Sequence, residues 1–137
     1  MRSQMSLYVV GADYPNQKGA GGRGGGNRRF EILLCSPGEP VALVPEPRNP
    51  VDPNAVMVLS ARNVQIGYLT AERAPWIGGM LRIGRVVRAI YQGPTAAGAA
   101  IRVAFDGEDP VLPVGGAAQA RAVDDSGFWP DAIPSDD

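Results

Sequence analysis

A proline-rich segment between two apolar runs constrains this chain more than any other feature. Residues 43–59 read LVPEPRNPVDPNAVMVL, and each of the four prolines fixes its own φ at about −65°. A proline also pushes the residue before it out of helical space. The segment therefore predicts a stiff, turning corner between two β-strands.

Two short polar residues in this corner, Asn49 and Asp52, stand directly before prolines. Such side chains can accept hydrogen bonds from nearby backbone N–H groups, or they can present polar atoms to a ligand. The sequence favours the local role and leaves the second one open.

The rest of the chain alternates short apolar runs with turn-forming residues, which is typical of a strand meander. Thr70 can cap a single helix that begins at Ala71 and carries an apolar stripe of Ala74, Ile77 and Leu81. Strands are expected over residues 7–10, 28–34, 41–44, 55–59, 64–69, 85–91 and 99–105, and a last short strand over 111–114 is left open.

The length of 137 residues has room for one domain with a modest core. We expect an N-terminal tail over 1–6, a folded domain over 7–114 and an acidic, partly disordered tail over 115–137. Residues 18–27 are so rich in glycine that a flexible loop is expected. Its stretch 19–24 matches the dinucleotide fingerprint, but a strand rather than a helix is expected to follow, so nucleotide binding is not favoured.

Charge is distributed unevenly along the chain. Residues 1–105 contain 12 basic and 6 acidic side chains, whereas residues 106–137 contain Arg121 and 8 acidic side chains. A basic folded part suits a phosphate backbone, and an acidic tail can compete with nucleic acid for the same surface.

The composition argues against catalysis. Histidine is absent, which removes the usual general base near neutral pH and most zinc sites. The single cysteine, Cys35, lies in an apolar run and is expected in the core. No apolar run approaches the roughly 20 residues of a membrane helix, and the N-terminus lacks a secretory signal. We therefore expect a cytoplasmic protein with no enzymatic activity and no cofactor or metal.

The motif Glu-Pro-x-Asn-Pro-x-Asp-x-Asn-Ala-Val-x-Val at 46–58, followed by Val-Gln-Ile-Gly-Tyr-Leu at 64–69, resembles the HIRAN domain. Val-Val-Gly at 9–11, before a tyrosine, fits the first strand of the same family. The resemblance spans about residues 7–105. It implies a mainly β fold, a small OB-like β-barrel of about six strands with one short helix, which binds the 3′-hydroxyl end of single-stranded DNA.

The resemblance also implies which residues contact DNA. Asn49 and Asp52 match the residues that hold the terminal nucleotide and its 3′-hydroxyl. Tyr14, and less closely Tyr91, match family aromatics that lie near a base. A carboxylate beside a polyanion is favourable only if it accepts a hydrogen bond from a terminal hydroxyl.

The chain departs from the family pattern at Asp13, Pro15, Val51 and Ala71. Val51 replaces an aromatic residue, and Ala71 replaces a basic one. Missing stacking and ionic contacts lower affinity by about 2 to 5 kcal/mol if nothing replaces them. The residues expected to contact nucleic acid are Tyr14, Arg48, Asn49, Val51, Asp52, Arg73 and Tyr91.

The leading hypothesis is a targeting module that binds single-stranded DNA ends for a separately encoded helicase or nuclease, in DNA repair or replication-fork processing. The alternative is a protein-interaction or inhibitory module, in which the basic barrel and the acidic tail recognise a partner protein.

Overall fold

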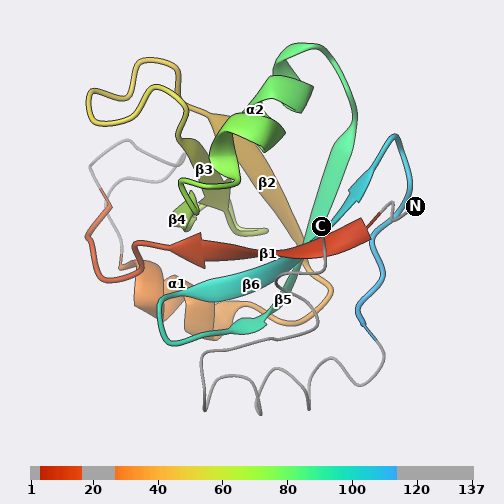
Figure 1. Cartoon of the computed structure of the whole chain (residues 1–137). Coiled ribbons are helices and arrows are strands. Elements are labelled where there is room, and N and C mark those ends of the chain that lie inside the picture. The colour runs from red at the N-terminus through yellow and green to blue at the C-terminus, as the bar shows by residue number, and fades with distance from the viewer. Residues whose placement is uncertain (1–3, 17–26, 114–137) are drawn as a thin grey trace.

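The computed structural model describes residues 4–16 and 27–113. In these residues a closed antiparallel β-barrel is accompanied by two short helices (Figure 1). The strands neighbour one another in the order β1-β4-β3-β2-β5-β6. Their bounds are β1 (Gln4–Val10), β2 (Pro40–Pro45), β3 (Val56–Leu59), β4 (Gln65–Leu69), β5 (Val87–Pro94) and β6 (Ala99–Phe105), and the helices are α1 (Arg28–Leu34) and α2 (Ala74–Arg82).

The barrel confirms the predicted fold class. Side chains that alternate along the strands fill its interior, among them Leu7, Val58, Ile66, Ile101 and Val103, none more than 1% exposed. The strands from residues 41 to 69 form the expected meander, since β2 pairs with β3 and β3 with β4. β6 closes the barrel by pairing with both β1 and β5.

The strand expected over residues 28–34 is wrong, because this segment forms helix α1. Asn27 caps the helix by accepting a hydrogen bond from the N–H of Phe30 at 3.0 Å. Only Ile32 joins the core, while Phe30 and Leu33 are exposed, so the apolar run does not mark a buried strand. A helix therefore does follow the glycine-rich stretch, but β1 ends at Val10, well before it.

Helix α2 begins later than predicted, at Ala74, because Pro75 is tolerated only in the first turn. Ala74, Ile77 and Met80 are buried, and Trp76 anchors the helix by packing its ring 5.5 Å from that of Phe105. Residues 111–113 form no strand. The predicted glycine-rich loop and acidic tail lie outside the described residues.

The proline-rich corner joins β2 to β3, as the sequence predicts. Its ends are held together where the N–H of Glu46 donates to the carbonyl of Ala55 at 2.9 Å. Next to it, β4 passes so close to β1 that a Cβ on Gly67 would lie 2.4 Å from the carbonyl oxygen of Val10. This close approach places the corner beside the end of β1.

Neither helix in the described part of the chain is long and apolar enough to cross a membrane.

Candidate nucleic-acid interface

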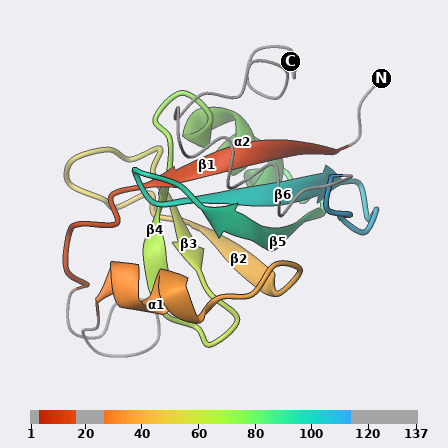
Figure 2. The same cartoon turned by 90° about the horizontal axis from the view of Figure 1, so that it is seen from below.

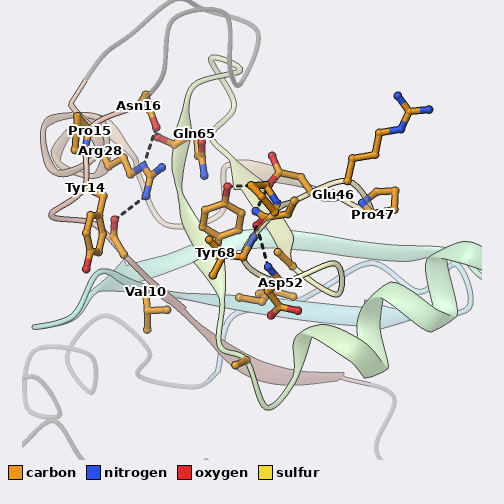
Figure 3. A pocket seen from close by; sticks show the side chains of 18 residues that line it. Val10, Tyr14, Pro15, Asn16, Arg28, Glu46, Pro47, Asp52, Gln65 and Tyr68 are labelled. Atoms are coloured by element: carbon orange, nitrogen blue, oxygen red, sulfur yellow. Dashed lines mark hydrogen bonds between the residues drawn. The ribbon is translucent and has the colours of Figure 1, made fainter.

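A groove of about 1070 Å³ lies between the proline-rich corner and the segment that follows β1. Figure 3 shows Tyr14, Asn16 and Arg28 on one side, Glu46 and Asp52 on the other, and Tyr68 between them. Small-ligand sites typically measure roughly 300 to 1,000 Å³, so the groove has room for a nucleotide and part of its neighbour. It combines apolar walls with a few fixed polar groups.

Arg28 is a buried cation in one wall of the groove, at 7% exposure. Its Nε donates to Oδ1 of Asn16 at 2.7 Å, and its Nη1 donates to the carbonyl of Gly11 at 2.9 Å. Burial lowers the pKa of the guanidinium, which nevertheless stays charged near neutral pH. Its Cζ lies 5.6 Å from the centre of the Tyr68 ring, within cation–π range.

Glu46 links the proline-rich corner to Tyr68 of β4 through hydrogen bonds. Its Oε1 accepts hydrogen bonds from the hydroxyl of Tyr68 at 2.8 Å and from Nδ2 of Asn49 at 3.0 Å. Burial, and then donation to Glu46, raises the pKa of Tyr68. Tyr68 is therefore held as a neutral phenol whose ring lies between Arg28 and the corner.

Asn49 and Asp52 shape the corner from within. Oδ1 of Asn49 accepts from the N–H groups of Val51 and Asp52 at 2.9 and 3.0 Å. Oδ1 of Asp52 accepts from the N–H of Asn54 at 2.9 Å. The local role that the sequence favours is thus confirmed for both residues. Among the described residues, no group bonds Oδ2 of Asp52, and this side chain remains part of the groove wall.

Three predicted residues form the rim of the groove. Tyr14 is 69% exposed, Val51 is 91% exposed and Arg48 is exposed. Tyr14 comes from the segment after β1, whereas Val51 and Arg48 come from the corner. An aromatic face, an aliphatic surface and a guanidinium are therefore available beside the groove.

Two of the predicted residues do not line the groove. Tyr91 is 2% exposed and belongs to the hydrophobic core, so the prediction that it meets a base is wrong. β5 directs this ring into the barrel. Arg73 occupies the N-cap position of α2 without a capping hydrogen bond from its side chain, and its Cζ lies 5.8 Å from the centre of the Trp76 ring. It is absent from the groove lining.

The sequence missed Arg28, Asn16, Glu46, Gln65 and Tyr68 as lining residues. Arg28 was assigned to a strand, and its burial depends on contacts made by α1. Tyr68 is the tyrosine of the Val-Gln-Ile-Gly-Tyr-Leu motif, which is the one signal that pointed to this wall.

The groove is less basic than the charge count suggests. Its lining contains two arginines, Arg28 and Arg48, and two carboxylates, Glu46 and Asp52, so the charges balance. Four other arginines of the barrel pair with acids: Arg29 with Asp13, Arg62 with Glu31, Arg85 with Asp106 and Arg88 with Asp109, at 2.6 to 2.9 Å. The last two acids belong to the acidic C-terminal part, so some of its charge is neutralised on the barrel.

Nothing in the described ranges suggests a metal site, since they contain no group of three or more Cys, Asp or Glu side chains able to hold an ion. Cys35 packs against the core, and burial raises the pKa of its thiol to about 11. A thiol with so high a pKa is a poor nucleophile near neutral pH.

Comparisons with known proteins agree with this architecture. The crystal structure of the HIRAN domain of human HLTF is 20% identical with a TM-score of 0.58, covering 92% of this chain and 90% of that chain. A structural-genomics protein from Lactobacillus plantarum is 16% identical with a TM-score of 0.53, covering 75% of this chain and 93% of that chain. No curated protein matches. The HIRAN domain model matches residues 20–106, more than half of the sequence. The chain therefore belongs to the HIRAN domain family.

Proposed function

We propose that the groove binds the 3′-hydroxyl end of single-stranded DNA and that the protein acts without catalysis. HIRAN domains are known as non-catalytic modules that bind DNA 3′ ends. The observation that carries the proposal for this chain is the arrangement around Asp52, whose Oδ2 is left over after Oδ1 has fixed the turn.

A carboxylate in a DNA-binding groove favours a terminal 3′-hydroxyl over an internal phosphodiester. An internal phosphodiester offers Asp52 only negative charge, whereas a terminal 3′-hydroxyl can donate a hydrogen bond to Oδ2. Hydrogen bonds to a charged acceptor contribute about 1.5 to 3 kcal/mol. Because Asn49 bonds the N–H of Asp52, the carboxylate is held in place before DNA arrives.

The remaining contacts follow from the groove walls. The exposed ring of Tyr14 offers a stacking face for a base, worth roughly 1 to 3 kcal/mol. Arg28 and Arg48 supply the positive charges for the phosphates nearest the end. Val51 contributes an aliphatic contact but no stacking, and Glu46 and Asp52 offset the two arginines, so we expect weak binding.

The experiment compares two labelled oligonucleotides of one sequence by fluorescence anisotropy at low salt. One carries a free 3′-hydroxyl and the other a 3′-phosphate. Tighter binding of the hydroxyl form supports the proposal, because the phosphate removes the donor and adds charge beside Asp52. Equal binding of the two, or no binding of either, refutes end recognition.

We further propose that the module delivers a separately encoded helicase or nuclease to DNA ends in repair or replication-fork processing. This role is suggested by the family, whose members are non-catalytic binding modules, because such a module needs a separate enzyme to act on the DNA that it holds. Affinity capture with and without a 3′-hydroxyl oligonucleotide tests it: the enzyme must be retained together with the DNA, and recovery of no such enzyme contradicts the role.

A further inference from the structure

Part of the outer face of strands β1, β6 and β5 is buried although it points away from the barrel core. Leu7, Ile101 and Val103 point inward, so the residues that alternate with them point outward. On this outer side Ala100 is 1% exposed, Ala104 0%, Ser6 5% and Gln92 1%. The outward residues around them are less buried: Gln4, Tyr8, Ile90 and Arg102 are half-buried, and Arg88 is exposed. A strand buried on both faces needs a layer on each. Figure 2 shows these three strands side by side, with α1 next to β4.

The two helices do not supply this layer, because α1 packs against β4 and α2 against β3. The outer side carries a polar cluster instead. Oγ of Ser6 donates to Oε1 of Gln92 at 2.8 Å, and Nη1 of Arg102 donates to Oγ of Ser6 at 3.2 Å. Nε2 of Gln92 is buried with no partner among the described residues. A buried amide without a partner is costly, so this donor marks a place where another polar group belongs.

The chain itself starts to form the missing layer just after β6. Gln4 of β1 donates to Glu108 and to the carbonyl of Asp109, and it accepts from the N–H of Val111. Asp109 also pairs with Arg88 of β5 at 2.6 Å. Since Gln4 and Arg88 flank Ala104 in the sheet register, residues 108–111 cross the outer face over the first row of outward residues.

We propose that the C-terminal segment 114–137 continues over this face and covers the rows that contain Ser6, Arg102 and Ala100. The described chain ends at Pro113, two residues after Val111 bonds Gln4, and 24 residues follow. β6 has seven residues, which span about 23 Å at roughly 3.3 Å each. The segment is therefore long enough to run the length of the strand and turn back.

The composition of residues 114–137 suits this face better than the composition of residues 1–3 or 17–26 does. It contains Val123, Phe128 and Trp129 for apolar cover, and five acids against Arg121. Its negative charge complements Arg102. Residues 1–3 are too few to cover two rows, and residues 17–26 offer mainly glycine together with two basic side chains. The acidic segment thus covers the barrel on a different face from the nucleic-acid groove and does not compete for it.

The test uses the full chain with Cys35→Ser and a nitroxide label on Ser126→Cys. At 14.4 kDa the protein suits amide-resolved NMR, in which the nitroxide removes signals near it. We expect loss of signals from β1, β6 and β5, including Ser6, Ala100 and Arg102, while β3 retains its signals. Loss around Tyr14 and Val51 would instead place the segment in the groove and overturn the proposal, as would weak, uniform loss over the whole surface.

Two arginine substitutions provide the matched comparison. Ala100→Arg places a long charged side chain under the proposed segment, whereas Ala42→Arg does so at an exposed outward position of β2. The first should restore the lost signals and the second should not. If Ala100→Arg does not fold, Arg102→Glu reverses the charge on the same face and should have the same effect. Restoration by neither variant refutes the proposal.

A second copy of the chain is the competing occupant of this face. The two cases are separated by mixing two samples of the chain: one carries the nitroxide but no ¹⁵N, and the other carries ¹⁵N but no nitroxide. Signal loss in the mixture shows that the segment reaches another molecule and rejects cover within one chain.

Discussion

Asp52→Asn is the substitution that most directly tests how the groove recognises a DNA end. Oδ1 of Asp52 accepts from the N–H of Asn54 at 2.9 Å, and an asparagine Oδ1 can accept the same bond. The change therefore keeps the turn and replaces the charged Oδ2 with a neutral Nδ2 group, which donates hydrogen bonds instead of accepting them. We expect the free energy of unfolding to change little, because surface changes of this kind usually stay within about 0.5 kcal/mol.

The effect on binding is expected to depend on the 3′ group. For the 3′-hydroxyl strand, the charge-assisted hydrogen bond from the hydroxyl, of about 1.5 to 3 kcal/mol, is replaced by a neutral one of about 0.5 to 1.5 kcal/mol, in which Nδ2 donates to the hydroxyl oxygen. The loss of about 1 to 1.5 kcal/mol corresponds to roughly a 5- to 10-fold weaker affinity. The 3′-phosphate strand should bind slightly better, because a repulsive charge has been removed.

The measurement is the ratio of the two dissociation constants by fluorescence anisotropy, in parallel with thermal unfolding of both proteins. The preference for the hydroxyl form should shrink about 5-fold or more. Arg48→Gln serves as the control, because a phosphate contact should weaken both strands alike. If Asp52→Asn leaves the ratio unchanged while the wild-type protein prefers the hydroxyl, Asp52 does not contact the end.

Four further changes test other parts of the reasoning. Val51→Trp should strengthen single-strand binding by about 1 to 3 kcal/mol, measured by anisotropy, since this side chain is 91% exposed and the fold tolerates the change; unchanged affinity would remove Val51 from the interface. Arg28→Met leaves two buried acceptors without donors and should lower the free energy of unfolding in urea by about 2 to 4 kcal/mol, whereas a loss below about 0.5 kcal/mol contradicts a structural role. Gly67→Ala should destabilise the barrel by more than about 2 kcal/mol, because its φ is 152° and the new Cβ would meet Val10; a normal melting temperature would refute the close approach. Because burial raises the pKa of Cys35 to about 11, from an ordinary 9.0, stability should fall as pH rises from about 9 towards 11, and iodoacetamide at pH 9 should modify the native thiol more slowly than the unfolded one.

Local chain chemistry made most of the strands predictable. The apolar runs between turn residues gave β2 to β6 nearly at their observed places, and the four prolines fixed the corner before β3. Helix α1 was not predictable in this way, because a seven-residue segment with only four apolar residues satisfies strand and helix patterns alike. Asn27 was the available signal, since an N-cap residue before such a run favours a helix.

The residues of the candidate site also fall into two groups, those that the local sequence revealed and those that only the fold brings together. Corner residues such as Asn49 and Asp52 are neighbours in sequence, so their motif revealed them together. Arg28 and Tyr68 lie far from the corner in sequence, and only the closure of the barrel brings them to it. Tyr91 shows the opposite error, since an aromatic residue on a strand can face either side and one strand alone does not say which side is the core.

The sequence by itself determined the β class, the stiff corner and the family motif, because prolines, glycines and apolar spacing act on the backbone within a few residues. Tertiary structure decided which side chains surround the groove and how their charges balance. It also decided that part of the outer side of β1, β6 and β5 is buried. These properties depend on which strands become neighbours when the barrel closes, and strand pairing joins residues whose separation along the chain leaves no local trace.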